Sequence, residues 1–380
     1  FKLHGIYFYS SGFITMVTSP RKENSRTITN RKGNSKFNDL IFILNPNSQG
    51  GNTGKNWDET YSKIKKYLPI KHQIMFTKKS NDGTLMTRKL LKEGYKNIAA
   101  VGGDGTINEV ANGFFHNRSS RNNSVTNFRD FKPTSQLKPL NPDGVLYIIP
   151  SGSRNVLAAS LRLQYEGIES FMHINEMKKS KIDVIGVTTA DKDDPTLTHN
   201  RLVLNAAEIG VGAEIIDRSK KVRNKVKNRL ISTVAGIIST VPTYESNSCE
   251  IILDNDKTIS PSLTMGIIAN GQFLGGGFNA APKANMSDGL MDLVILKDSG
   301  SLKMLDKFVS LKGDDGYTEE DNILYYQVSQ VTLLPKERDM TVSLDGEPVG
   351  ILPASFRIYH NALSVKANTQ DSLSNIQNQN

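Results

Sequence analysis

Apolar and polar residues follow two different patterns along the chain. Between residues 39 and 160, short apolar runs alternate with amphipathic stretches, and this alternation favours a parallel sheet covered by helices. The runs at 39–46, 71–77, 96–105 and 144–150 predict strands, and the stretches at 52–68 and 81–94 predict helices.

Beyond residue 180 the pattern changes to strand-like runs separated by turns, which predicts an antiparallel β domain. The runs begin at 181, 200, 249, 262, 290, 330, 340 and 354, and the second of them extends to residue 215. A helical excursion is predicted near 217–241, and the Ser- and Asn-rich stretch 116–143 predicts a long surface insertion.

The two ends of the chain are poor in apolar residues. Residues 19–36 are basic and polar, and residues 366–380 are rich in Asn and Gln, so both are expected to be disordered. Residues 5–17 are apolar but too short for a membrane span, and Met16 is a candidate start. The predicted organisation is therefore a basic disordered segment (1–36), an α/β domain (37–178), a β domain (179–365) and a disordered tail (366–380).

Composition adds a constraint on partners. The chain of 380 residues has 47 Lys and Arg against 38 Asp and Glu, a net charge of +9 and a pI near 9.3. A basic surface favours a polyanionic partner, which can be an acidic membrane surface, nucleotide phosphates or a nucleic acid. Cys249 is the single cysteine, which excludes an internal disulfide, and the six histidines have no zinc-site spacing. A reducing, intracellular setting is expected.

The segment VGGDGTINEVANGFF (101–115) carries the first chemical signal. Gly102, Gly103 and Gly105 lie between a predicted strand and a predicted helix, so backbone N–H groups and a helix N-terminus converge there. An anion such as a phosphate fits this place, and a side chain at Gly103 is expected to fill that space and to strain the backbone. An ordinary turn is the alternative reading.

Three further segments support the anion site. LNPNSQGGNTGK (44–55) resembles a Walker A loop but is one residue short and has Asn56 where Ser or Thr is required, so it is not a P-loop. IPSGSRNVLAAS (149–160) brings another turn to the same sheet edge, because the ends of parallel strands meet in one crevice. A glycine-rich crossing follows at 269–296.

The motifs NPNSQGG, GGDGTINEVANG, PSGSRN, NGQFLGGGF, SDGLMDLVIL and LDGEP resemble, in order and approximate spacing, those of the diacylglycerol kinase catalytic family, over about residues 38–362. That family includes bacterial diacylglycerol kinases and the sphingosine and ceramide kinases. The resemblance implies an N-terminal α/β nucleotide-binding domain with a parallel sheet, a C-terminal antiparallel β-sandwich domain for the lipid, and a cleft between them. It also implies transfer of the γ-phosphate of ATP, with Mg²⁺, to the hydroxyl of a diacylglycerol or sphingoid-type lipid.

The resemblance also implies site residues. The ATP-binding set is Asn45, Thr77, Gly102, Gly103, Asp104, Gly105, Thr106, Asn108, Ser153 and Asn155. The catalytic set is Asp104, Asp345 and Glu347; the general base is either in the LDGEP motif or at Asp104, for which we favour the role beside the metal. Arg154 departs from the family, where Gly is usual, and it is either a phosphate contact or a solvated charge.

Two further assignments follow from the same resemblance. A structural Mg²⁺ is expected on the Asp288 carboxylate with backbone oxygens of Asn285 and Leu290, although Asp288 can equally begin a turn. Glu214 aligns with a residue that contacts the lipid head group in sphingosine kinases. The basic, amphipathic segment 217–244 is either an interfacial helix on an anionic membrane or a helix packed on the β domain.

The expected protein is thus a cytoplasmic, peripherally membrane-associated lipid kinase that binds no nucleic acid, and a homodimer is an open option. A NAD kinase-like enzyme shares the GGDG loop but lacks the starting NPNSQGG and final LDGEP motifs. A catalytically silent lipid-binding protein is the second alternative, although such a protein would have no need of Asp104, Asp345 and Glu347.

Overall fold

The computed structural model describes residues 38–116, 127–131, 133, 136–223, 236, 239–240, 244–254, 257–275, 277–297 and 322–369. The segments predicted to be disordered, at 1–36 and beyond 369, lie outside the described residues. The same holds for much of the insertion at 116–143 and for most of the basic segment 217–244, including Lys225 and Lys227.

The N-terminal domain contains a parallel sheet, which confirms the predicted fold class. Its strands are β1 (Leu40–Leu44), β2 (His72–Phe76), β3 (Asn97–Gly102) and β4 (Val145–Pro150), in the spatial order β4-β3-β1-β2. Its helices are α1 (Asn52–Lys55), α2 (Trp57–Ile64), α3 (Asp82–Lys92), α4 (Asp104–Asn112), α5 (Val156–Ser160) and α6 (Ile168–Met172). The single helix predicted over 52–68 is thus two short helices, preceded by a 3₁₀ turn (Ser48–Gly51).

Side chains alternate across this sheet and build a core on each face. On one face, Ile41, Ile43 and Ala100 pack with α3 and α4; on the other, Phe42 and Leu44 pack with α2 and α6. A parallel sheet buried on both faces requires such continuous apolar strands, and β1 is LIFIL with all five residues buried.

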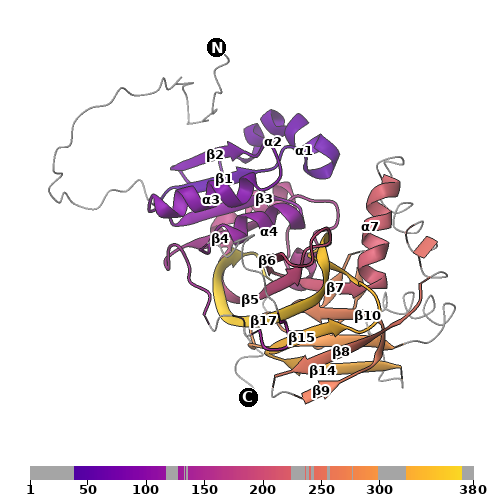
Figure 1. Cartoon of the computed structure of the whole chain (residues 1–380). Helices are drawn as coiled ribbons and strands as arrows, with labels where there is room; N and C mark the ends of the chain where they lie inside the picture. The colour runs from indigo at the N-terminus through magenta and orange to yellow at the C-terminus, as the bar shows by residue number, and fades with distance from the viewer. Residues whose placement is uncertain are drawn as a thin grey trace, which may run out of the picture.

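The C-terminal domain is an antiparallel β-sandwich, also as predicted (Figure 1). One layer contains β7 (Ala206–Gly210), β10 (Ser262–Ala269), β13 (Met291–Lys297), β14 (Ile323–Val328) and β16 (Thr341–Leu344). The other contains β5 (Lys178–Ala190), β6 (Thr198–Val203), β8 (Asn247–Leu253), β9 (Lys257–Ile259), β15 (Gln330–Pro335) and β17 (Glu347–Ala367). One apolar cluster fills the space between the layers, with contributions such as Ile209, Ile251 and Phe356.

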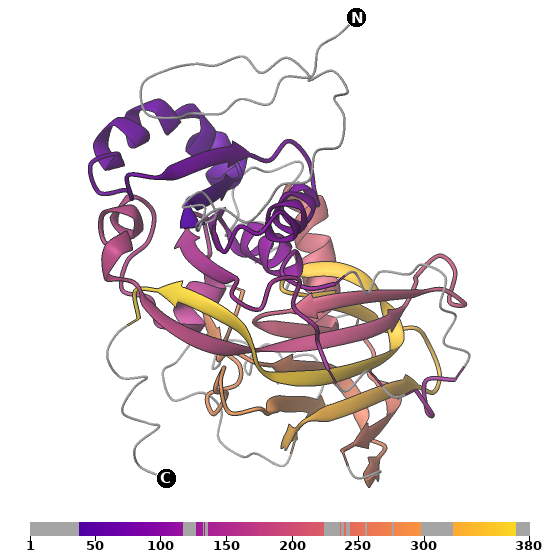
Figure 2. The same ribbon diagram turned by 90° about the vertical axis from the view of Figure 1, so that its left-hand side faces the viewer.

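The two domains are joined through the long strands β5 and β17, which run side by side and bend from the sandwich toward the parallel sheet (Figure 2). The end of β17 pairs in parallel with β4, with Val365 opposite Leu146 and Lys366 opposite Tyr147. The predicted disordered tail is therefore wrong at its first residues: Lys366 and Ala367 lie in β17, because β4 and β5 supply them with backbone partners.

The helix of the second half begins earlier than predicted. Residues 206–210 form β7, Gly210 has φ +77°, and α7 (Val211–Arg223) begins at the next residue. The alternation of Val211, Ala213 and Ile215 suggested a continuing strand, but all three are buried residues of a helix, in which Val211 and Ile215 lie one turn apart on the same face. They pack on the outer face of β7 and β10, so that α7 stands against the sandwich (Figure 1).

The described part of the insertion reaches the β-sandwich. Phe128 is buried and packs against Phe131, and Arg129 donates a 2.6 Å hydrogen bond to Glu250 of β8. None of the described helices has the length and apolar character needed to cross a membrane.

Candidate functional site

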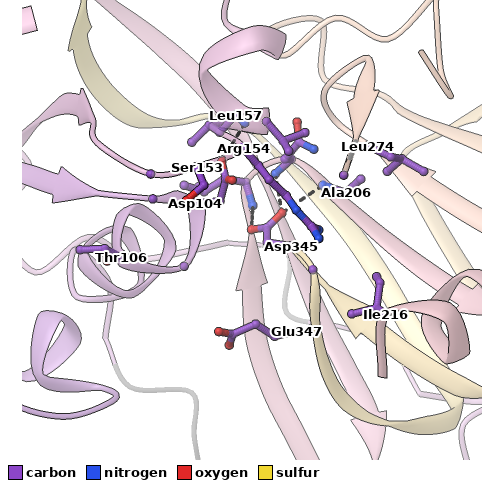
Figure 3. A pocket seen from close by; sticks show the side chains of 18 of the residues that line it. Asp104, Thr106, Ser153, Arg154, Leu157, Ala206, Ile216, Leu274, Asp345 and Glu347 are labelled. Atoms are coloured by element: carbon purple, nitrogen blue, oxygen red, sulfur yellow. Dashed lines mark hydrogen bonds between the residues drawn. The ribbon is translucent and has the colours of Figure 1, made fainter. Parts of the chain in front are cut away.

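A cavity of about 520 Å³ opens between the two domains at the carboxyl ends of the parallel strands. Asp104, Thr106 and Ser153 line one side, Ile216 and Leu274 line the opposite side, and Asp345 and Glu347 lie between them (Figure 3). The cavity therefore has a polar end on the α/β domain and an apolar end on the β-sandwich.

The polar end is built around the N-terminus of α4. The carbonyl of Gly103 accepts hydrogen bonds from the amides of Thr106 (2.9 Å) and Ile107 (3.1 Å). The amides of Asp104 and Gly105 precede the first internal bonds of the helix and are left for a ligand. Their partial positive charge favours an anion, as the sequence predicted.

Gly103 and Gly152 bring two loops into backbone contact. A Cβ on Gly152 would lie 2.4 Å from Cα of Gly103, and a Cβ on Gly103 would lie 3.2 Å from Cα of Gly152. The predicted backbone strain at Gly103 is wrong, since its φ is −85°, which any residue adopts. Glycine is required here by the neighbouring loop and by the cavity, not by the dihedral angle.

Asp104 connects the Gly103 loop to the Gly152 loop by a hydrogen bond. Its Oδ1 accepts a 2.9 Å hydrogen bond from the amide of Leu157 at the start of α5, while the residue itself lines the cavity. This bond fixes the carboxylate between the loop 102–105 and the Ser153 loop. The second oxygen remains available to a ligand, because no described residue donates to it.

Asn45 and Thr77 lie at the ends of neighbouring strands. The side-chain amide of Asn45 donates to Oγ1 of Thr106 at 3.0 Å, and the amide of Thr77 donates to the carbonyl of Leu44 at 2.9 Å. Both residues line the cavity beside the loop that holds Gly103 and Gly105, and their contact with a nucleotide stays a prediction.

Asp345 and Gly346 form the tight turn between β16 and β17. Their φ angles of +46° and +78° suit the Asp-Gly pair of a two-residue hairpin. Oδ1 of Asp345 accepts from the amides of Asn205 (2.9 Å) and Ala206 (3.1 Å); Oδ2 accepts from the amide of Leu204 (2.9 Å) and from Nδ2 of Asn108 (2.6 Å). Burial raises the pKa of Asp345 to about 6, although these four donors oppose the rise.

Because its four acceptor positions are occupied, Asp345 holds α4 against the loop before β7. We expect Asp345→Asn to lower the free energy of unfolding by about 2–3 kcal/mol, since the new NH₂ group faces amide donors and leaves them unpaired. Urea denaturation measures this change. Asp143→Asn is the control: its carboxylate pairs with Lys96 at the exposed surface, where solvent screens the ion pair, and its replacement should leave the free energy of unfolding nearly unchanged. Equal stability of the two variants would contradict the bridging role.

Glu347 differs from Asp345. It is exposed on the cavity wall, and no described residue donates a hydrogen bond to its carboxylate. Its Oε1 would lie 3.4 Å from a Cβ built on Gly105, so the carboxylate faces the N-terminus of α4 (Figure 3).

The other predicted ATP residues divide into two groups. Thr106 and Ser153 line the cavity, whereas Gly102, Asn108 and Asn155 support it from behind. A Cβ on Gly102 would lie 2.6 Å from the Thr106 side chain. Asn155 is buried; its Oδ1 accepts from the amide of Gly152 (2.8 Å), and its Nδ2 donates to Glu166 (2.6 Å).

The predicted metal residues lie outside the cavity, in the turn before β13. Oδ1 of Asp288 accepts from the amide of Leu290 (2.9 Å), and Oδ1 of Asn285 accepts from the amide of Ser287 (3.1 Å). Burial, and then the nearby Asp183, raise the pKa of Asp288. The described residues hold no group of three or more His, Cys, Asp or Glu side chains suited to a metal ion. The structural Mg²⁺ at Asp288 therefore stays a prediction.

Glu214 lies in the first turn of α7 and does not line the cavity; its Oε2 lies 3.8 Å from Arg218. Three of the charged residues that line the cavity were not predicted: Lys79, Glu109 and Glu208. Glu109 accepts from the amides of Asn81 (2.7 Å) and Gly83 (3.1 Å) and so caps α3. Glu208 lay within a run read as an ordinary strand, and only the pairing of β7 shows which way it faces.

Comparison with known families gives two matches that together span both domains. The model for the diacylglycerol kinase catalytic domain matches residues 39–187. The model for the YegS C-terminal NAD kinase beta sandwich-like domain matches residues 205–367.

Individual relatives agree with these matches. The chain is 25% identical to a diacylglycerol kinase of Bacillus subtilis (strain 168) over 280 residues, which is 73% of this chain and 79% of the relative. It is also 25% identical to a probable YegS-like lipid kinase of Chromohalobacter salexigens over 279 residues, or 72% and 77% of the two chains. The crystal structure of a putative diacylglycerol kinase from Bacillus anthracis superposes with a TM-score of 0.62 at 18% identity, covering 88% of this chain and 98% of the other, and shows the same fold.

Proposed function

This chain belongs to the diacylglycerol kinase catalytic domain family with a YegS-type C-terminal domain, and from that premise we propose that it is an ATP-dependent lipid kinase. The proposed reaction transfers the γ-phosphate of ATP to the hydroxyl of a diacylglycerol or sphingoid-type lipid.

One observation carries the proposal: a single cavity joins an anion-binding helix N-terminus to an apolar wall. Gly103 and Gly105 lie at the anion end, and Ile215, Met265 and Phe278 lie at the apolar end. A phosphate chain and a lipid head group can therefore meet there, with a carboxylate between them. Phosphoryl transfer depends mainly on such positioning and on charge neutralisation.

Glu347 is the proposed base, because its carboxylate is exposed in the cavity while that of Asp345 is saturated by structural donors. It accepts the proton of the lipid hydroxyl as the hydroxyl oxygen bonds to the γ-phosphorus. The bond between that phosphorus and the bridging oxygen of ADP breaks, and ADP leaves with the electron pair.

Asp104 and the phosphates of ATP fit the preference of Mg²⁺ for one or two carboxylates plus substrate oxygens. When bound, Mg²⁺ supplies positive charge that offsets the charge of the transferred phosphoryl group. Asp104 would hold that ion with its second carboxylate oxygen, because the bond from the Leu157 amide fixes its first.

We expect Asp104→Asn to lower kcat by about 10²-fold, because the asparagine oxygen keeps the bond from Leu157 but the charge is lost. Steady-state kinetics at several Mg²⁺ concentrations measure the loss. The urea midpoint should match that of the unchanged protein. Turnover within about threefold of normal would remove Asp104 from the metal-linked role.

The competing soluble-metabolite kinase is tested by offering the purified chain two acceptors with ATP and Mg²⁺. Phosphorylation of diacylglycerol or a sphingoid base in micelles, with none of NAD, supports the lipid kinase. Phosphorylation of NAD alone would replace the proposal by the alternative, and ligand binding without ATP turnover would support the silent lipid-binding protein.

Association with an anionic membrane surface belongs to the same proposal. The net charge of +9 and the apolar cavity wall beside α7 support it, since a lipid acceptor must reach the cavity from a bilayer.

A further inference from the structure

Glu208 places a carboxyl group on the apolar wall of the cavity. In β7 it lies opposite Ser343 of β16 and Ile267 of β10. Side chains alternate along a strand, and Ala207 and Ile209 belong to the core between the two layers. Glu208 therefore faces the other way, toward α7, with Ala206 and Ile267.

The first turn of α7 leaves room for this carboxyl group. A Cβ on Gly212 would lie 3.0 Å from Oε2 of Glu208 and 2.5 Å from Cε of Met265. Gly212, Met265 and Glu208 all line the cavity. The carboxylate is thus held between an apolar wall and open cavity space, where a ligand can reach it.

The surroundings of Glu208 do not satisfy a charged carboxylate. No described residue donates a hydrogen bond to it, and burial raises its pKa to about 7. Arg154 lies on the opposite loop and opposes that rise, and its side chain extends across the cavity (Figure 3). Neither the phosphate loop nor the Asp345 network uses Glu208.

A carboxylate beside an apolar wall that no protein donor satisfies becomes costly when a ligand covers it, so a site that keeps one is suited to a ligand that supplies the donor. A diacylglycerol has a single free hydroxyl, which is consumed in the transfer, and otherwise offers only ester oxygens. A lipid with a second hydroxyl or an amine beside the reacting hydroxyl retains a donor.

We propose that Glu208 accepts a hydrogen bond from the head group of the lipid acceptor and so selects acceptors that carry a hydroxyl or amine beside the phosphorylated hydroxyl. This inference rests on the lipid kinase function proposed above. Glu208 is then a specificity residue and takes no part in proton transfer.

The test compares kcat/KM for three acceptors of matched chain length in mixed micelles: 1,2-diacylglycerol, 1-monoacylglycerol and sphinganine. The unchanged protein should prefer at least one of the two donor-bearing acceptors over diacylglycerol by tenfold or more. Monoacylglycerol and sphinganine separate a hydroxyl donor from an ammonium donor. If none of the three is phosphorylated, the lipid kinase function itself fails, which is a different result from a lack of preference.

Glu208→Met keeps the length of the side chain and removes the acceptor. It should lower kcat/KM for the preferred acceptor by about 10–100-fold, leave diacylglycerol within about threefold and leave KM for ATP unchanged. Glu208→Gln keeps one acceptor oxygen and should retain more activity than the Met variant on a hydroxyl donor. Glu337→Met is the matched control, because Glu337 is exposed in the turn after β15 and should change nothing.

Three results would overturn the inference. The first is equal use of all three acceptors by the unchanged protein. The second is an equal loss by Glu208→Met on every acceptor with KM for ATP unchanged, which would mark a general structural or catalytic role. The third is a loss of the preference for donor-bearing acceptors in Glu214→Gln but not in the Glu208 variants. That result would assign the contact with the lipid head group to α7.

Discussion

Glu347→Gln is expected to lower kcat about 10³-fold on any lipid acceptor, while KM for ATP changes little. The amide keeps the size of the side chain beside Gly105 but cannot take the proton of the attacking hydroxyl. Steady-state kinetics with saturating lipid measure the effect.

The stability of this variant provides the control, since Glu347 is exposed and its replacement should leave the urea midpoint unchanged. A variant with more than a tenth of normal turnover would show that the base is elsewhere. Asp345→Asn should differ from Glu347→Gln, because it should lower the urea midpoint as well as the activity.

Gly103→Val is expected to abolish detectable binding of ATP. The valine methyl groups would extend from a Cβ already 3.2 Å from Cα of Gly152, within a part of the cavity that Gly103, Asp104, Gly105 and Gly152 all line, so they would displace the loops or reduce the space for phosphate. Isothermal titration calorimetry with ATP and Mg²⁺ measures the loss.

The φ of Gly103 permits any residue, so the variant should fold with a changed loop rather than a strained backbone. Gly277→Ala is a useful comparison, because Gly277 has φ +80° and no atom within 4 Å of a built Cβ. Gly277→Ala should lower the stability of its own loop but leave the affinity for ATP nearly unchanged. Unchanged affinity in Gly103→Val would contradict the phosphate-loop interpretation.

The sequence predicts the parts of this molecule that depend on local pattern. The apolar runs of β1, β3 and β4 and the glycines after β3 are visible in the chain itself, because strand burial and close backbone approach each impose a residue type. The parallel sheet, the antiparallel sandwich and the glycine-containing loop between β3 and α4 were therefore predictable.

Features that depend on distant pairing were not predictable. Asp345 and Glu347 stand two residues apart in one motif, yet four donors from residues 108 and 204–206 occupy the first and none of the described residues occupies the second. Similarly, Val211, Ala213 and Ile215 alternate as in a strand, but Gly210 and the apolar outer face of β10 favour a helix there. That Glu208 lines the cavity could be seen only once the register of β7 and the position of Gly212 were known.

Lipid kinase activity can be measured by incubating the purified chain with γ-³²P-labelled ATP, Mg²⁺ and a total lipid extract, alongside the Glu347→Gln variant. We expect label in chloroform-soluble lipids with the unchanged protein and almost none with the variant. No label in the chloroform phase with the unchanged protein, or equal lipid labelling by both proteins, would contradict the lipid kinase function with Glu347 as its base.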